Sequence, residues 1–143
     1  QEGEVERVGA SSSIEVDVRV VAATNKSLEE EIEEGRFRAD LLDRLNVVPL
    51  EVPALRERSG DVRLLAEHFL SLACEVHERP GKQISPAAMK RLEAYPYPGN
   101  VRELRNLVER LVILTPDALI GESEAEALLP LRSAAPQGSY FQP

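Results

Sequence analysis

Hydrophobic residues change their spacing along the chain near residue 59. Before this point they alternate with polar residues or form short runs. Valines alternate with Asp and Arg from Val16 to Val20 and then continue as VVAA, which predicts a strand that becomes buried on both faces toward its carboxyl end. The run VVPLEV at residues 47–52 predicts a second strand, and EVERVG at residues 4–9 predicts a short edge strand.

Two short helices are predicted between these strands. Ser27 begins a capping box for a helix over about residues 28–34, and Gly35 ends it. Asp40 is the expected cap of a second helix that ends near residues 45–46. The first 58 residues therefore read as strand, helix, helix, strand, which indicates part of an α/β domain.

From residue 60 onward the spacing of apolar residues is helical. It predicts a helix that Pro80 and Gly81 stop, a second one that opens at Ser85–Pro86, a third capped by Asn100, and a short acidic helix over about residues 122–129. The expected buried positions are Val62, Leu65, Ala66, Phe69, Leu72, Ala73 and Val76, then Ala88, Met89 and Leu92, and then Val101, Leu104, Leu107, Val108, Leu111 and Leu114. We therefore expect an α/β part at residues 1–58, an all-α part at 59–130, and a linker or tail at 131–143.

Composition narrows the functional classes. The chain has 143 residues and a net charge of -8, from 17 Lys and Arg against 25 Asp and Glu, so broad attraction to nucleic acid phosphates is not expected of it. No apolar run approaches the roughly 18 residues that span a bilayer, so no membrane segment is predicted. The single cysteine, Cys74, fits a buried thiol in a reducing cytoplasm, and a first residue other than Met suggests an excised fragment.

Four polar residues stand where phosphate chemistry could use them. Arg102 follows the predicted cap Asn100 in PYPGNVREL, so its charge and the free backbone N–H groups of a helix start could face one anion. Asn25 follows a predicted buried strand, where α/β sheets place ligands. Arg38 lies just before the second predicted helix, which Asp40 caps, and Arg44 lies within that helix.

Three of these four residues also have a structural interpretation. Arg102 could be a solvated charge offset by Glu103, and Asn25 could satisfy turn backbone. Arg44 lies four residues after Asp40, which predicts an ordinary i,i+4 ion pair worth about 0.3–0.5 kcal/mol. Spacing alone leaves both interpretations open.

The motifs in their order resemble one family. VDVRVVAATN, GRFRADLLDRLNVVPLEVPALRERSGDV and YPYPGNVRELRN are similar to the C-terminal part of the AAA+ domain of bacterial enhancer-binding proteins, the ATP-driven activators of sigma-54 RNA polymerase, over residues 1–130. The resemblance implies the C-terminal part of an α/β P-loop NTPase core followed by a helical lid. It also implies ATP with Mg²⁺ at the interfaces of a homo-oligomeric ring, usually a hexamer, in the cytoplasm.

The same resemblance implies roles for the four residues. Asn25 matches the sensor I residue near the γ-phosphate, and Arg102 matches sensor II, which reports from the lid on the nucleotide of the same subunit. Arg38 and Arg44 match arginines that reach into the neighbouring subunit's site, with Arg44 as the main finger. Arg56 and Arg58, in the segment between the two parts, are expected to be structural or interface residues.

Several family features are absent from the sequence. The chain contains no GxxxxGK[ST] phosphate loop, no acidic Walker B strand end and no GAFTGA-like loop for sigma-54, all of which would precede residue 1, and a DNA-binding module would follow the tail. The chain alone is therefore expected to bind ATP negligibly. Asp43 replaces a common aromatic residue and Tyr97 a frequent tryptophan. Another AAA+ machine and a non-enzymatic interaction module remain alternatives, whereas a helix-turn-helix at residues 86–114 is disfavoured because its second helix carries a continuous apolar stripe.

Overall fold

A computed structural model describes residues 4–9 and 11–130 of the chain. The chain divides into two units between Glu51 and Val52, and each unit is described by itself. The predicted linker or tail at residues 131–143 lies outside the described residues. Within the described residues, no helix combines the length and the apolar character that crossing a bilayer requires.

The first unit contains a small antiparallel hairpin. Strand β1 (Glu4–Glu6) pairs with β2 (Ser13–Glu15), and Val5 faces Ile14 in the register. The predicted edge strand within residues 4–9 is thus confirmed. Its partner β2 was not predicted, because SSSIE carries neither alternation nor a continuous apolar run.

Two short helices follow in the first unit. Helix α1 (Leu28–Glu33) begins where predicted, since the Ser27 side chain accepts a hydrogen bond from the backbone N–H of Glu30. Helix α2 spans Ala39–Leu45, and its cap position is Arg38. The prediction that Asp40 caps α2 was wrong, because the Asp40 carboxylate lies in the first turn and pairs with Arg38 instead.

The two principal strands predicted for the first unit are absent from the described structure. Residues 16–24 and 47–52 have no strand assignment, and apolar side chains along both are exposed, with Val21 at 84% and Leu50 at 87% of full exposure. A strand needs hydrogen-bonded neighbours at its edges, and the described residues offer these two segments none. The apolar pattern therefore marks surface that has no cover in the described part of the chain.

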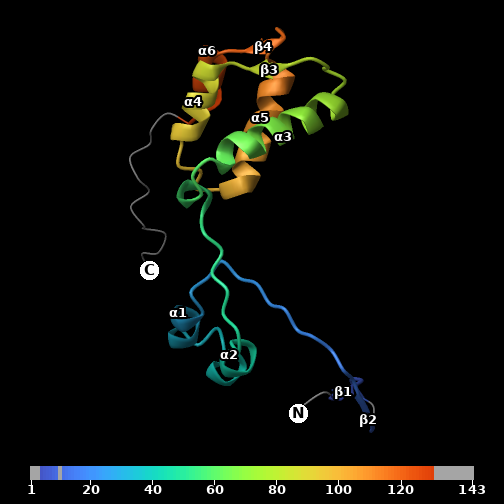
Figure 1. Cartoon of the computed structure of the whole chain (residues 1–143). Coiled ribbons are helices and arrows are strands. Elements are labelled where there is room, and N and C mark those ends of the chain that lie inside the picture. The colour runs from blue at the N-terminus through green and yellow to red at the C-terminus, as the bar shows by residue number, and fades with distance from the viewer. Residues whose placement is uncertain (1–3, 10, 131–143) are drawn as a thin grey trace. The chain divides into compact units, whose positions relative to one another are not determined.

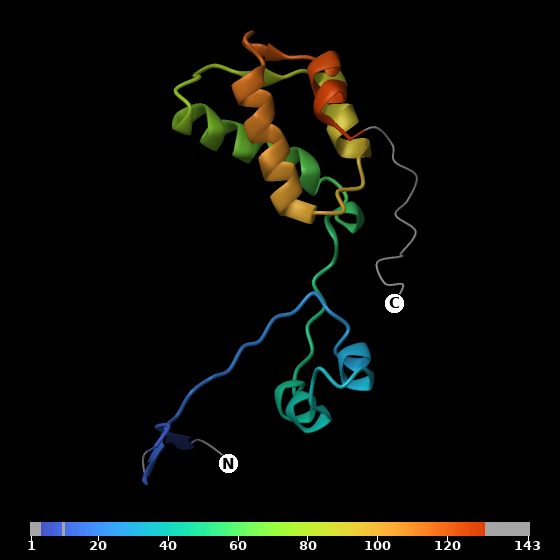
Figure 2. The ribbon, with the colours of Figure 1, turned by 180° about the vertical axis from the view of Figure 1, so that it is seen from behind.

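Over its described residues, 52–130, the second unit contains four α-helices. They are α3 (Asp61–Val76), α4 (Pro86–Ala94), α5 (Asn100–Leu114) and α6 (Glu122–Leu128), preceded by the 3-10 turn η1 (Leu55–Glu57). Figure 1 shows α3 and α5 packed across each other and α4 beside α6, and Figure 2 shows the same pairs from behind. The short parallel strands β3 (Gln83–Ile84) and β4 (Leu119–Ile120) tie the loops after α3 and α5 together.

The helix boundaries of this unit follow local chemistry. The Ser85 side chain accepts a hydrogen bond from the backbone N–H of Ala88 and Pro86 occupies the first turn, as the sequence predicted. The buried Lys82 donates from Nζ to the backbone carbonyls of Thr115 and Asp117, beyond the end of α5. A cation in that place suits the negative end of the helix dipole.

The core of the second unit lies between α3, α4 and α5. Most predicted core positions are buried or half-buried, and Ala66, Leu92, Leu104, Val108 and Leu111 are inaccessible to solvent. Three predictions were wrong, because Leu72, Val76 and Leu114 are exposed. The buried stripe runs instead through Leu70 and Cys74 on α3 and Val112 on α5, since it shifts around each helix near its end.

Candidate functional site

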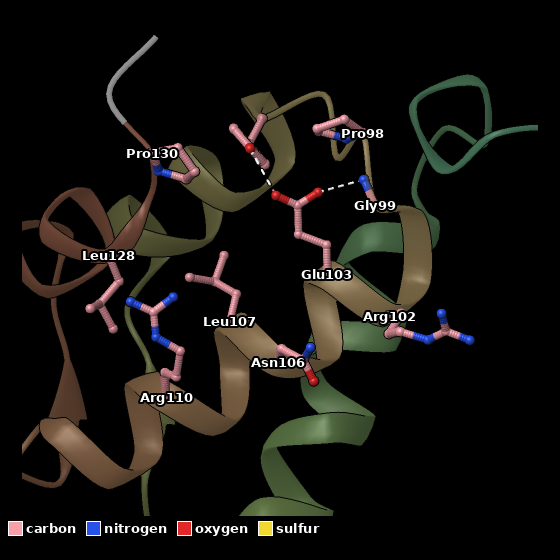
Figure 3. A pocket seen from close by; sticks show the side chains of 10 residues that line it. Pro98, Gly99, Arg102, Glu103, Asn106, Leu107, Arg110, Leu128 and Pro130 are labelled. Atoms are coloured by element: carbon pink, nitrogen blue, oxygen red, sulfur yellow. Dashed lines mark hydrogen bonds between the residues drawn. The ribbon is translucent and has the colours of Figure 1, made fainter. Parts of the chain in front are cut away.

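The start of helix α5 is held by one carboxylate. Glu103 accepts a hydrogen bond from the backbone N–H of Gly99 at 2.7 Å and another from the Tyr95 hydroxyl at 2.9 Å, as Figure 3 shows. The sequence placed the cap of this helix at Asn100, whereas the helix cap is Gly99. Glu103 therefore ties the chain before α5 to the first turn of the helix.

Asn100, the predicted cap of α5, does not cap this helix but forms a hydrogen bond to another segment. Its backbone is left-handed, with φ of 51°, a conformation that Asn tolerates better than most residues. Its side-chain oxygen accepts a hydrogen bond from the backbone N–H of Leu55 at 2.9 Å, in the turn η1. Because Leu55 is only 2% exposed, this bond fixes η1 against the start of α5.

Tyr97 anchors the loop that precedes α5. Its ring is fully buried, and its hydroxyl donates to the backbone carbonyl of Leu92 at 2.8 Å. The Tyr95 ring meets it edge to face at 4.9 Å. Tyr97 has a φ of 47°, which is rare for a bulky residue and which the surrounding packing must impose. Burial raises the pKa of the Tyr97 phenol, and the Glu103 charge adds to the increase.

Arg102 is presented by this fixed helix start. It is the third residue of α5, one position later than predicted, because the cap is Gly99. The side chain is exposed, and within residues 4–9 and 11–130 it takes part in no hydrogen bond or ion pair. Figure 3 shows its guanidinium extending away from α5, on a different side from Glu103.

An open groove of about 550 Å³ lies along the start of α5. Its lining includes Tyr95, Glu103 and Leu107 together with Leu128 and Pro130 from the end of α6 and beyond. Arg102 and Arg110 also line the groove, and Figure 3 shows Arg110 near Leu128 and the Arg102 side chain extending outward from α5. Arg102 is therefore part of the lining of this groove, together with a second cation, Arg110.

The first unit places its two candidate arginines at the ends of α2. Arg38 forms a bidentate ion pair with Asp40, with Nε–Oδ1 at 3.0 Å and Nη2–Oδ2 at 2.7 Å. This guanidinium holds the pKa of the Asp40 carboxyl below its usual range. Arg44 is exposed in the last turn and has no ion pair among the described residues. The predicted Asp40–Arg44 pair is therefore not formed, because Asp40 faces Arg38.

Asn25 lies in a bend after the exposed segment of residues 16–24. The backbone turns there because the Thr24 hydroxyl accepts a hydrogen bond from the N–H of Lys26 at 3.1 Å. The Asn25 side chain is exposed and makes no hydrogen bond in the part of the chain that the structure covers. Asn25, Arg38 and Arg44 belong to the first unit and Arg102 to the second.

Sequence reasoning missed three parts of the α5 start: the Tyr95 hydroxyl, the Gly99 cap and the bond from Leu55 to Asn100. Asn100 and Glu103 have the three-residue spacing of a capping box, so the sequence pattern favoured Asn100 and gave no signal for Gly99. The Leu55–Asn100 bond joins residues 45 apart, and nothing in one sequence indicates it. In the segment between the two predicted parts, Arg58 pairs with Asp61 at 2.7 Å.

Comparison with known families defines the class of protein. Residues 56–136 match the AAA+ ATPase lid domain family, and residues 1–51 match the sigma-54 interaction domain family. The chain belongs to the AAA+ domains of bacterial enhancer-binding proteins, the sigma-54-dependent activators, and corresponds to the C-terminal portion of such a domain. The predicted fold class, a part of an AAA+ α/β core followed by a helical lid, is confirmed by these matches and by the solved structures below.

Individual relatives agree with this assignment. The chain is 50% identical over 135 residues to the transcriptional regulatory protein ZraR of Salmonella typhimurium, covering 94% of this chain and 30% of that protein. It is 50% identical over 129 residues to the DNA-binding transcriptional regulator NtrC of Azospirillum brasilense, covering 90% of this chain and 27% of that protein. The chain thus spans less than a third of the length of these relatives.

Solved structures of one relative resemble the chain. NtrX from Brucella abortus, crystallised in complex with ADP, matches with a TM-score of 0.77 and 41% identity over 92% of this chain and 31% of that one. The same protein in complex with ATP matches with a TM-score of 0.75 and 44% identity, over 90% of this chain and 30% of that one. Nucleotides therefore bind to that relative.

Proposed function

We propose that this chain supplies the lid and the sensing residues of an ATP-hydrolysing, sigma-54-dependent transcriptional activator. Residues 1–58 would complete the nucleotide-binding α/β part, residues 59–130 would form the lid, and residues 131–143 would be a linker or tail. The parent protein would act as a homo-oligomeric ring in the cytoplasm, remodel sigma-54 RNA polymerase through a loop upstream of residue 1, and bind DNA through a further domain.

The start of α5 supports the proposal most directly. Glu103, Asn100 and Tyr97 fix where the helix begins, while the Arg102 side chain stays exposed and without an ion pair among the described residues. A helix start carries partial positive charge, so a cation there is not stabilised by the helix itself. A fixed backbone that carries a free guanidinium is suited to binding the phosphates of a nucleotide.

The remaining candidates fit distinct steps of phosphoryl transfer. Asn25 would orient the attacking water or contact the γ-phosphate, and Arg102 would bind the nucleotide held by its own subunit. Arg44 would reach the neighbouring subunit's site and stabilise charge on the transferred phosphoryl group, with Arg38 beside it. The exposure of Arg44 and the absence of an Asp40–Arg44 ion pair support this role.

Magnesium is expected to accompany ATP as its counter-ion. The described residues contain no group of three or more His, Cys, Asp and Glu side chains that could hold a metal ion. We therefore assign no residue of this chain to Mg²⁺, and no step of the proposal depends on one.

The test compares Arg102→Ala with Arg105→Ala in the full-length parent. Arg105 is exposed on the same helix and serves as the matched control. We expect R102A to lower kcat/KM for ATP by at least tenfold with an almost unchanged melting temperature, because a charged hydrogen bond contributes about 1.5–3 kcal/mol, and R105A to leave kcat/KM within about twofold, as is usual for a surface substitution. Equal kinetics for R102A and wild type would contradict the proposal.

A further inference from the structure

We infer that Glu103 is a positioning residue for Arg102: its two hydrogen bonds, from Gly99 and Tyr95, hold the first turn of α5 in the orientation that aims Arg102 at a nucleotide. This inference rests on the nucleotide role proposed above for Arg102. It assigns to Glu103 a function in ATP turnover without any contact between Glu103 and the nucleotide.

Each carboxylate oxygen of Glu103 accepts one of these hydrogen bonds. Oε2 accepts from the backbone N–H of Gly99 at 2.7 Å, and Oε1 accepts from the Tyr95 hydroxyl at 2.9 Å. Charge-assisted hydrogen bonds of this length are about twice as strong as neutral ones. The sequence alternative, in which Glu103 offsets the charge of its neighbour Arg102, is not what the structure shows, because no ion pair joins them in the described structure.

Tight packing at Gly99 supports the same conclusion. A Cβ atom built on Gly99 would lie 2.9 Å from Cβ of Glu103 and 3.1 Å from its Oε2. The Cβ atom of Glu103 is bonded directly to the helix backbone and cannot move away by a rotamer change. A side chain at position 99 would therefore displace Glu103 or the loop. Glycine is therefore required here for close approach rather than for its backbone freedom, since its φ is -88°.

Arg102 directly precedes Glu103 in the chain, so the two share one helical turn. If the Glu103 contacts are lost, the orphan N–H of Gly99 and the free Tyr95 hydroxyl no longer fix the entry of the chain into α5. A displacement of about 1 Å at a phosphate-binding group can cost up to about 100-fold in rate. The Glu103 contacts thus stabilise a geometry on which the Arg102 guanidinium depends.

The experiment measures ATP hydrolysis by the full-length parent with Glu103→Ala, Glu103→Gln and the control Glu109→Ala. E103A removes both acceptors, whereas the amide of E103Q can still accept from Gly99 and donate to the Tyr95 oxygen. Glu109 is a carboxylate farther along the same helix that pairs with His77 at 2.8 Å. We expect kcat/KM to fall about tenfold in E103A, mainly through a higher KM, and to stay within about threefold of wild type in E103Q and E109A.

A double-mutant cycle separates positioning from general stability. Because Glu103 acts through Arg102, adding E103A to R102A should lower kcat/KM no further than R102A does alone. If R102A lowers kcat/KM and E103A does not, or if the two losses multiply, the positioning role is overturned. If R102A itself has no effect, the proposed nucleotide role of Arg102 fails first, and the two failures are thereby distinguished.

Discussion

Leu55 and Asn100 are joined across 45 residues of sequence by one hydrogen bond. The backbone N–H of Leu55 donates to the side-chain oxygen of Asn100 at 2.9 Å, and the Leu55 side chain is buried in the core of the helical unit. The segment that enters the lid and the helix that carries Arg102 are therefore fixed to each other. A displacement of η1 would therefore displace the start of α5 as well.

Substituting Asn100 should reveal two separate contributions to stability. N100A leaves the half-buried N–H of Leu55 without a partner, which costs about 1–3 kcal/mol, and forces alanine into a left-handed conformation at about 1 kcal/mol more. N100G avoids the second cost. We expect urea unfolding of the helical unit to rank wild type above N100G and N100G above N100A. Equal midpoints for wild type and N100A would show that the bond does not stabilise the fold.

The Arg38–Asp40 ion pair should be visible in a carboxyl titration by NMR. The ordinary pKa of Asp is 3.8, and Arg38 lowers that of Asp40. Because the folded-state pKa is depressed, the pair is complete above this ordinary value and is lost as the pH falls through the lower one. R38A should return the pKa of Asp40 toward 3.8. R44A should leave it unchanged, and an equal effect of R44A would restore the Asp40–Arg44 pair expected from spacing.

Tyr97 should make the helical unit sensitive to alkaline pH. Its pKa in the folded protein is raised above the ordinary 10.0 by burial. A raised pKa means that this contribution to stability is complete below pH 10 and is lost as the pH rises above it. In urea unfolding between pH 8 and pH 11, wild type should lose stability more steeply than Y97F. At pH 8, the free energy of unfolding of Y97F should be lower than that of wild type by about 1 kcal/mol, because Y97F lacks the hydrogen bond from the Tyr97 hydroxyl to Leu92. Parallel curves would contradict the burial argument.

Arg44 and Arg102 are expected to act at the same ATP site from different subunits. Each single alanine variant of the full-length parent should therefore lose most of its ATPase activity, by about 10³-fold or more for R44A. Rings mixed from R44A and R102A subunits should regain activity, because some interfaces then combine an intact Arg44 with an intact Arg102. Mixed rings as inactive as the single variants would place both residues in one subunit's site.

Residues 1–143 by themselves should bind Mg-ATP negligibly. The sequence lacks the GxxxxGK[ST] motif, whose backbone N–H groups cradle the phosphates, and Arg102 alone supplies one cation. Calorimetric titration of the isolated chain should therefore give no measurable heat of binding. Micromolar affinity would show that the lid carries a nucleotide site of its own, in which case the groove beside Arg110 becomes the place to mutate.

Local chemistry made the helical unit predictable from its sequence. Ser85–Pro86 set the start of α4, and the three-and-four spacing of apolar residues set α3 and α5. The wrong predictions of burial lie near the ends of helices, where the buried face shifts around the helix. Val76 and Leu114 are predicted to be buried from the spacing but are exposed in the fold.

The first unit was less predictable, because its strands depend on partners. The apolar runs at residues 16–24 and 47–52 favour strands, but pairing in a sheet is a long-range property that a single segment does not contain. Side-chain partners were missed for a similar reason: Asp40 has Arg38 and Arg44 within reach along the sequence, and only the backbone turn at Arg38 decides between them. The roles of Asn25 and Arg44 remain predictions.

The exposed valines of the first unit have a practical consequence for anyone who isolates this chain. Val20, Val21, Val47 and Val48 are each at least 69% exposed, in two β-prone segments that pair with no other strand among the described residues. Such segments recruit one another between molecules and seed aggregation. The helical unit, from Val52 onward, has a buried apolar core of its own. Trimming the chain to that unit should therefore improve its solubility and leave Arg102 on its fixed helix start.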